Sequence, residues 1–372
     1  MKEKRVIFVV IILIMALVGY GAYMNNRKVY VGFAAGLSGQ WSQLGVQVRN
    51  GFLQAVEDIN AEGGINGYEI VPIIIDDKND NTYAQSMLDK LNDNKVDFFV
   101  GFSVSSMTLT VEYFMENSDM LIISPTMSTN DLSGIDDNFI RICNASSEEA
   151  YKLVDMLKDE GLHEFSILYD ISNRPYTEPL HDIIVNDTLD SDLKLVLDRP
   201  FNSHDDDYDV LVDEVVKSQA KQVVILASGV DTADLVQRLR IKGSQAVFYS
   251  SAWSTTRDLL ENGGKAIEGM RVVGLYDIAS ERPEYLEFRQ TMIDKFDADP
   301  TFSQIFGYES LVVLKQAVEH VDSFEVNKVK EAILELKEFQ GLQQKLVFNV
   351  YGDMERDYFT YEIRNGQFVD KD

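Results

Sequence analysis

Serine and threonine side chains gather in the loops after two short apolar segments, and they are the first candidates for chemistry. The stretch Gly101-Phe102-Ser103-Val104-Ser105 begins like the turn that exposes a nucleophilic serine, but the closing glycine of that motif is absent. No histidine accompanies it at a suitable place. Neither a GxGxxG fingerprint nor a GxxxxGK(S/T) loop occurs, so the usual nucleotide sites are also missing. The sequence therefore predicts no catalytic residue, no cofactor and no enzymatic activity.

Metal and nucleic-acid sites lack support as well. Cys143 is the only cysteine, which excludes an intrachain disulfide and a CxxC zinc or redox site. The four histidines are scattered without ligand-like spacing, and the acidic run at 205–209 lacks the central glycine and distal glutamate of a calcium loop. The net charge of −27 argues against a groove for a nucleic-acid backbone, which needs clustered basic side chains. We expect no metal site and no nucleic-acid partner.

The hydroxyl-rich loops remain as a possible anion site. They contain Ser103, Ser105 and Ser106 after a predicted strand at 97–101, and Thr126, Ser128 and Thr129 after one at 121–124. Ligands of open α/β sheets bind beyond the carboxyl ends of the strands. Hydroxyls and free N–H groups at helix N-termini suit a carboxylate, although the same residues can also serve only as helix caps. Both interpretations stay open at this point.

These loops depend on an alternation of strands and helices that begins at Val29. Short β-branched or aromatic runs alternate with segments of helical period, which predicts parallel sheets covered by helices on both faces. The predicted strands are 29–34, 69–75, 97–101, 121–124, 165–169, 222–227, 247–250 and 270–275. A chain of 372 residues suits two lobes of about 150 residues each.

The C-terminal part has a different pattern. Predicted helices at 283–296, 304–320 and 327–336 lead into one predicted antiparallel meander of strands at 345–349, 358–364 and 367–369. Gly352-Asp353 and Asn365-Gly366 are the turn signals within it. No long linker occurs, so we expect several short crossings between the lobes.

The N-terminus predicts a membrane location. Lys2, Lys4 and Arg5 precede an uncharged stretch at 6–24, which as a helix reaches about 28 Å and spans a bilayer. The basic residues keep the N-terminus in the cytoplasm and send the rest outside. A cleavable signal peptide is the alternative, but the run is long and no A-x-A site follows it. We predict a single-pass anchor, with residues 1–27 forming cytoplasmic tip, transmembrane helix and linker.

Six segments in order resemble the landmarks of one family. They are GLSGQWSQLG (36–45), DINAEGGING (58–67), IIIDDKND (73–80), VGFSVSS (100–106), IISPTMST (122–129) and FIRI (139–142). The chain thereby resembles type I periplasmic binding proteins of the branched-chain amino-acid-binding kind, which are related to the ligand domains of metabotropic glutamate and natriuretic-peptide receptors. The resemblance runs from Val29 to the C-terminus and is strongest before Ile142.

The resemblance implies an α/β two-lobed clamshell that closes on a small molecule. Three crossings near Asn144, Asp277 and Asn349 would divide the chain into a lobe of 28–144 plus 277–348 and a lobe of 145–276 plus 349–372. The predicted ligand-binding residues, taken from the resemblance, the hydroxyl loops and the two tryptophans, come from both lobes. They are Trp41, Leu44, Ser105, Ser106, Thr126, Ser128, Tyr176, Ser228, Asp231 and Trp253.

Within that set the resemblance implies roles for several residues. Ser105 and Ser128 match the carboxylate-binding hydroxyls of the family, and Tyr176 matches a ligand-contacting aromatic residue. Ser228 and Asp231 lie in another contacting loop, although Asp231 can equally be the cap of the next helix. The chain has two tryptophans, Trp41 and Trp253, and both fall in loops that are predicted to line the cleft.

One position departs from the family pattern. Where amino-acid binders carry an acid for the ligand's α-ammonium, this chain reads YSSAWST, with Ala252 or Trp253 at that place. A buried ammonium without a counter-charge costs several kcal/mol. Either Asp231 replaces the missing acid or the ligand lacks an amine.

The functional expectation is an extracytoplasmic solute-binding protein that delivers a ligand such as an amino acid to an ABC permease. The alternative is a ligand-sensing input protein for a membrane sensor kinase or chemoreceptor, with an aromatic or amine-free carboxylate as its ligand. An outward-facing enzyme or structural protein is a third class, disfavoured because no catalytic motif is found.

Overall fold

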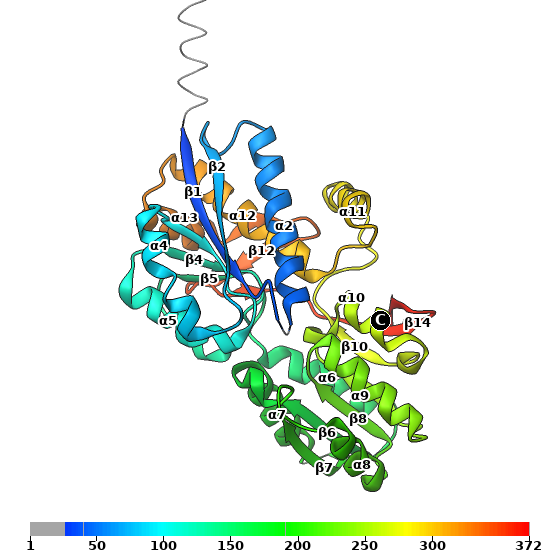
Figure 1. Cartoon of the computed structure of the whole chain (residues 1–372). Coiled ribbons are helices and arrows are strands. Elements are labelled where there is room, and N and C mark those ends of the chain that lie inside the picture. The colour runs from blue at the N-terminus through cyan, green and yellow to red at the C-terminus, as the bar shows by residue number, and fades with distance from the viewer. Residues whose placement is uncertain (1–26, 40, 190, 372) are drawn as a thin grey trace, which may run out of the picture.

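The chain forms two α/β lobes, each around its own β-sheet, and a small third sheet (Figure 1). The structure is a computed structural model that describes residues 27–39, 41–189 and 191–371. We call the part around the five-stranded sheet lobe 1, at the top of Figure 1, and the part around the seven-stranded sheet lobe 2.

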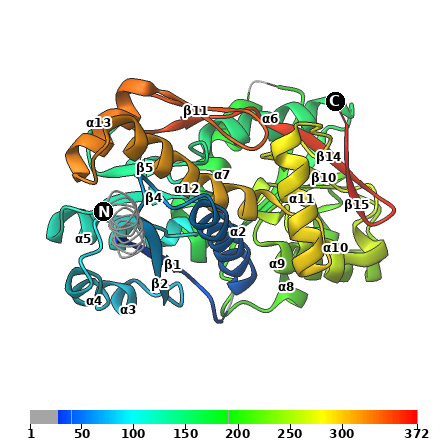
Figure 2. The same ribbon diagram turned by 90° about the horizontal axis from the view of Figure 1, so that it is seen from above.

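Lobe 1 is built on five parallel strands in the order β2-β1-β3-β4-β5. These are β1 (Lys28–Ala35), β2 (Glu69–Asp76), β3 (Phe98–Val100), β4 (Leu121–Ser124) and β5 (Phe139–Arg141). β3 and β4 are buried along their whole length, as parallel strands covered on both faces must be. In Figure 2, α2 (Ser42–Ala61) and α12 (Phe302–Val321) lie on one side of the sheet, and α4 (Leu88–Asp93) and α5 (Thr108–Asn117) on the other. The short helix α3 (Asn81–Gln85) precedes α4.

Two glycines let α2 and α12 pack closely against each other. A Cβ atom on Gly51 would overlap the carbonyl oxygen of Gln304, and one on Gly307 would overlap that of Val48. Residues without a Cβ are therefore required at this crossing. The close contact fixes the start of α12, at Phe302, relative to α2.

Lobe 2 is built on seven strands in the order β15-β14-β10-β9-β8-β6-β7. The parallel strands are β6 (Glu164–Asp170), β7 (Lys194–Phe201), β8 (Gln222–Leu226), β9 (Val247–Ser250) and β10 (Arg271–Gly274). The antiparallel hairpin β14 (Phe359–Arg364) and β15 (Gln367–Asp370) completes one edge. The helices of this lobe are α6 (Ser147–Asp159), α7 (Arg174–Thr188), α8 (Tyr208–Ser218), α9 (Gly229–Ile241) and α10 (Arg257–Gly263).

The chain passes between the two sheets three times: after β5, after β10, and between β13 (Met354–Glu355) and β14. After the second passage come α11 (Pro283–Phe296), α12 and α13 (Val326–Leu336), and then the small sheet β11 (Glu338–Gln340), β12 (Lys345–Phe348) and β13. The guanidinium of Arg356, in the third passage, pairs with Glu309 of α12 where both side chains are almost completely buried. It also donates to the carbonyl oxygen of Ile142, in the first passage, at 2.7 Å.

The predicted alternation of strands and helices is confirmed: each of the eight predicted strands overlaps an observed parallel strand. The predicted turn at Asn365-Gly366 joins β14 to β15 with Arg364 opposite Gln367. The prediction of one C-terminal meander is wrong, because β12 pairs with β11 and β13 while the hairpin extends the sheet of lobe 2. Strand β7 was not predicted, since this edge strand is half-buried and contains Asp198, Arg199 and Pro200.

The predicted membrane anchor at residues 6–24 lies outside the described residues. Within the ranges that the structure does describe, none of the helices combines the length and the apolar character needed to cross a bilayer.

We predict that Arg356→Met destabilises the protein by about 3–5 kcal/mol, because it leaves the Glu309 carboxylate buried without its partner. Urea unfolding of the described domain, residues 27–371, measures the difference. Lys328→Met is the matched control, since Lys328 pairs with Glu325 on the surface. A similar unfolding midpoint for both variants would contradict a structural role for the buried pair.

Candidate ligand-binding site

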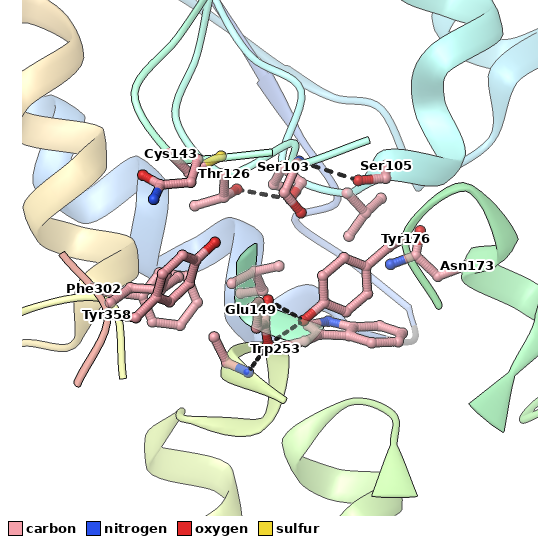
Figure 3. Close-up of a pocket in the computed structure, with 16 residues that line it drawn as sticks. Ser103, Ser105, Thr126, Cys143, Glu149, Asn173, Tyr176, Trp253, Phe302 and Tyr358 are labelled. Carbon is pink, nitrogen blue, oxygen red and sulfur yellow. Dashed lines mark hydrogen bonds between the residues drawn. The ribbon is translucent and has the colours of Figure 1, made fainter. Parts of the chain in front are cut away.

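A cavity lies between the two lobes, and both contribute to its walls (Figure 3). Lobe 1 supplies Leu44, Ser103, Val104, Ser105, Thr126, Ser128 and Phe302; lobe 2 supplies Glu149, Asn173, Tyr176, Ala252 and Trp253; the passages supply Cys143, Asn144, Leu275 and Tyr358. The empty space between these side chains, including its mouth, is about 450 Å³. Sites for small ligands have this mixture of many apolar and few polar groups.

The wall from lobe 1 carries hydroxyls at the start of a helix. A short 3₁₀ turn at Ser105–Met107 follows β3 and leads directly into α5. The hydroxyl oxygen of Ser105 accepts from the backbone N–H of Ser128 at 3.2 Å, so its own proton can point into the cavity. The Thr126 hydroxyl donates to the carbonyl oxygen of Ser103 at 2.7 Å. Hydroxyls beside a helix N-terminus are suited to a carboxylate.

The wall from lobe 2 carries a buried acid, Glu149, in the first turn of α6. The Tyr176 hydroxyl donates to both of its carboxylate oxygens at 3.0 Å, and the backbone N–H of Ala252 donates to Oε1 at 2.5 Å. Burial raises the pKa of Glu149 to about 7, against the lowering effect of these two donors. In Figure 3, Glu149 and Trp253 face the Ser103, Ser105 and Thr126 side chains across the cavity.

Six of the ten predicted binding residues line this cavity: Leu44, Ser105, Thr126, Ser128, Tyr176 and Trp253. Ser106 and Trp41 line a neighbouring hollow at the edge of the cleft. Ser228 and Asp231 line neither; the Ser228 hydroxyl caps the start of α9 and bonds to the Asp231 carboxylate. The structure thus separates Asp231 from the cavity in which an ammonium partner was expected.

Asp231 instead contacts the other lobe. The indole N–H of Trp41, at the left-handed residue before α2, donates to its Oδ2 at 3.4 Å, and the Tyr208 hydroxyl donates to Oδ1 at 2.7 Å. The Trp41 ring also lies 5.3 Å from the rings of Trp253 and His204. We call these five residues the Trp41 cluster. Trp253 is shared with the wall of the cavity, but the contacts of Trp41 with Asp231 and His204 join the lobes without any ligand.

A second direct bond between the lobes lies nearby. The backbone N–H of Ser106 in lobe 1 donates to the side-chain oxygen of Asn173 in lobe 2 at 2.9 Å. Asn173 also lines the cavity. The lobes are therefore in contact around the cavity.

Several cavity residues were not predicted from the sequence, and Glu149 is the most informative of them. It falls on the buried stripe of α6 with Ala150, Leu153, Val154 and Leu157, where an acid is out of place. An acid on this stripe was a signal in the sequence from which a buried functional residue could have been predicted. Phe302 and Tyr358 come from distant segments whose local patterns give no indication of a site.

The cavity holds no candidate metal centre. Among the residues at 27–39, 41–189 and 191–371, no three His, Cys, Asp or Glu side chains gather closely enough to hold a metal ion. Cys143 is buried and its thiol contacts the carbonyl oxygen of Met127 at 3.2 Å. Burial raises the pKa of this thiol to about 12, so it is no nucleophile.

Two α/β lobes, three passages between them and a mixed cavity at their contact define a two-lobed binding protein. A family model named periplasmic binding protein matches residues 28–367, and the chain belongs to this family. The resemblance seen in the sequence is confirmed. The family is ligand-binding and non-enzymatic, and its binding domain is extracytoplasmic.

The relatives agree on the fold and differ in ligand. The leucine-, isoleucine-, valine-, threonine-, and alanine-binding protein of Pseudomonas aeruginosa is 25% identical over 361 residues, covering 94% of this chain and 93% of its own. Among solved structures, a TM-score of 0.85 at 17% identity relates the chain to a Streptococcus pneumoniae branched-chain amino acid transporter substrate binding protein, solved with isoleucine. The match covers 92% of this chain and 98% of that protein. An R. palustris ABC transporter solute binding protein, solved with benzoate, has a TM-score of 0.83 at 17% identity. The match covers 92% of this chain and 95% of that protein.

We predict that Trp41→Ala opens the lobes in the absence of ligand. It removes an indole N–H bond and two ring contacts that join the lobes, each worth about 0.5–1.5 kcal/mol. Small-angle scattering should show a larger radius of gyration than in the wild type, whereas Tyr113→Ala, an exposed change on α5, should not. Equal radii for wild type and Trp41→Ala would show that the Trp41 cluster does not hold the lobes together.

Proposed function

We propose that the protein is an extracytoplasmic solute-binding protein of an ABC-type uptake system, and that it binds a small amino acid or a related carboxylate between its lobes. The observation that carries the proposal is the cavity itself, because neither lobe alone provides both the hydroxyl wall and the acidic wall. A ligand in this position contacts both lobes only when they are together.

Binding then acts by shifting a population. A ligand that touches both walls has a higher affinity for the closed arrangement than for the open one, and it stabilises closure by that difference. Closure is the signal that a membrane partner recognises. In this proposal the Trp41 cluster contributes free energy that favours the closed arrangement even without a ligand.

The wall from lobe 1 supports a carboxylate in the ligand. The Ser105 and Ser128 loops face the cavity at the start of α5, where the helix dipole favours negative charge. The ligands named for the two related structures, isoleucine and benzoate, share a carboxylate and little else. Leu44, Val104 and Phe302 offer an apolar surface for the remainder of such a molecule.

We propose that residues 1–27 tether the domain outside the cell beside an ABC permease; these residues contain the uncharged stretch described above. A sensory partner, a sensor kinase or chemoreceptor, is the alternative that the same fold serves. Loss of radiolabelled ligand uptake on deletion of the gene would support transport, and unchanged uptake with a lost transcriptional or chemotactic response would support sensing.

A thermal-shift screen of residues 27–371 against amino acids and simple aromatic and aliphatic acids tests the binding function. Ligands that bind the native state raise the unfolding midpoint. A true ligand should also reduce the radius of gyration if it draws the lobes further together. No stabilisation by any member of either class would count against the proposal.

We predict that Ser128→Ala weakens binding of the ligand found in this screen by about 1.5–3 kcal/mol, the loss of one hydrogen bond to a charged group. Calorimetric titration measures the change, and Ser86→Ala, at an exposed serine that ends α3, is the control. Full affinity in Ser128→Ala would remove this hydroxyl from the carboxylate site.

A further inference from the structure

Glu149 is the only carboxylate among the residues that line the cavity, and no Lys, Arg or His lines it. Only 2% of the residue is exposed. Within the described part of the chain no ion pair includes Glu149; its partners are the neutral Tyr176 hydroxyl and the Ala252 N–H. An acid buried without an opposite charge is costly, so its presence needs a reason.

The fold itself does not supply that reason. A glutamine at position 149 could accept the same hydrogen bonds through its amide oxygen, without the cost of burying a charge. The two donors also leave part of the carboxylate free, because its two oxygens together can accept about four hydrogen bonds. The free part belongs to a residue that lines the cavity, where a ligand would lie.

We propose that Glu149 is the receptor for a protonated amine of the ligand, and that the amine displaces a proton which Glu149 holds in the empty cavity. The inference rests on the proposed function and narrows it to amine-bearing ligands. The carboxylate comes from α6, not from the loop after β9, where the sequence has Ala252 and Trp253, and not from Asp231, which belongs to the Trp41 cluster.

The geometry suits a ligand with charges at both ends. The hydroxyl wall of lobe 1 and Glu149 of lobe 2 lie on opposite sides of the cavity (Figure 3). A ligand with its carboxylate on the first wall and its ammonium on the second would bridge the lobes. An acid without an amine would leave Glu149 with no opposite charge and would bring a second negative charge into the same cavity.

The groups around Glu149 allow it to exchange a proton near neutrality. Its pKa is raised to about 7 by burial, while its place in the first turn of α6 favours the ionised form. Tyr176 of α7 and Tyr358 and Cys143 of the passages also face it, and burial raises the pKa of each, so they stay neutral. The two arginines that act on Cys143 are already paired, Arg141 with Asp353 and Arg356 with Glu309.

The sign of the pH dependence follows from this exchange. An ammonium binds the ionised form of Glu149, so the affinity for an amine-bearing ligand should rise with pH until Glu149 is fully ionised. With a pKa of about 7 in the empty protein, the affinity should be about tenfold higher at pH 8 than at pH 6. A ligand without an amine would prefer the protonated form, and its affinity should rise as the pH falls.

Calorimetric titrations of residues 27–371 at pH 6, 7 and 8 test the proposal. The probes are the twenty common amino acids and, for each that binds, the carboxylic acid that lacks only its amine, together with benzoate. Titrations in buffers of different ionisation enthalpy should show release of about half a proton per amino acid at pH 7. Glu149→Gln should lower the affinity for amino acids at least tenfold at pH 8, and this affinity should no longer depend on pH. Glu148→Gln, the same change at the exposed neighbour on α6, is the control.

The outcomes separate the two proposals. Binding of amino acids with this pH dependence supports both. Binding of amine-free acids that strengthens at low pH, or that improves in Glu149→Gln, would overturn the role of Glu149 while leaving a solute-binding protein. Binding of no probe would overturn the proposed function and this inference with it.

Unfolding without ligand gives an independent measurement. The pKa of Glu149 is higher in the folded protein than in the unfolded chain, so its contribution to stability is full at low pH and is lost as the pH rises toward 7. Relative to Glu149→Gln, the wild type should therefore lose stability between pH 5 and pH 8. A constant difference would show that Glu149 is already ionised in the empty cavity and releases no proton.

Discussion

The arrangement of the whole molecule depends on the buried ion pair between Arg356 and Glu309. The two sheets share no strand, so the lobes are held together by the three passages and by the direct contacts of Trp41 and Asn173. Arg356 in the third passage binds Glu309 of α12 and the carbonyl oxygen of Ile142 in the first, while Asn144 donates to the Arg356 carbonyl oxygen at 2.7 Å. Asn144 and Tyr358 also line the cavity. The segments that connect the two lobes therefore form part of its wall as well.

The cavity combines two different ways of accommodating charge. Lobe 1 offers hydroxyls and a helix N-terminus, which stabilise an anion without any full positive charge. Lobe 2 offers Glu149, a buried carboxyl group held by two neutral donors, with its pKa raised to about 7 by burial. The hydroxyls of the first wall cost little to bury, whereas a buried acid without an opposite charge lowers the stability of the empty protein.

Contacts between the lobes fall into two groups that a ligand affects differently. In the proposed function the cavity walls meet through the ligand, while the Trp41 cluster and the bond from Ser106 to Asn173 join the lobes directly. Direct contacts reduce the free energy that a ligand must supply for closure, but they also reduce the difference between empty and occupied protein. The balance of the two groups sets how clearly a membrane partner can distinguish the two states.

The sequence alone determined the alternation of strands and helices, the hydroxyl loops after β3 and β4, and the family. These features depend on local periodicity and on short motifs, which residues close in the chain specify. Tertiary structure decided the rest. The C-terminal strands divide between two sheets because pairing depends on which edges are free, and Asp231 faces Trp41 because α9 and the loop before α2 meet only in the assembled lobes. Glu149 could be noticed in the sequence as an acid on the buried stripe of α6, but only its contacts with α7 and the loop after β9 place it in the wall of the cavity.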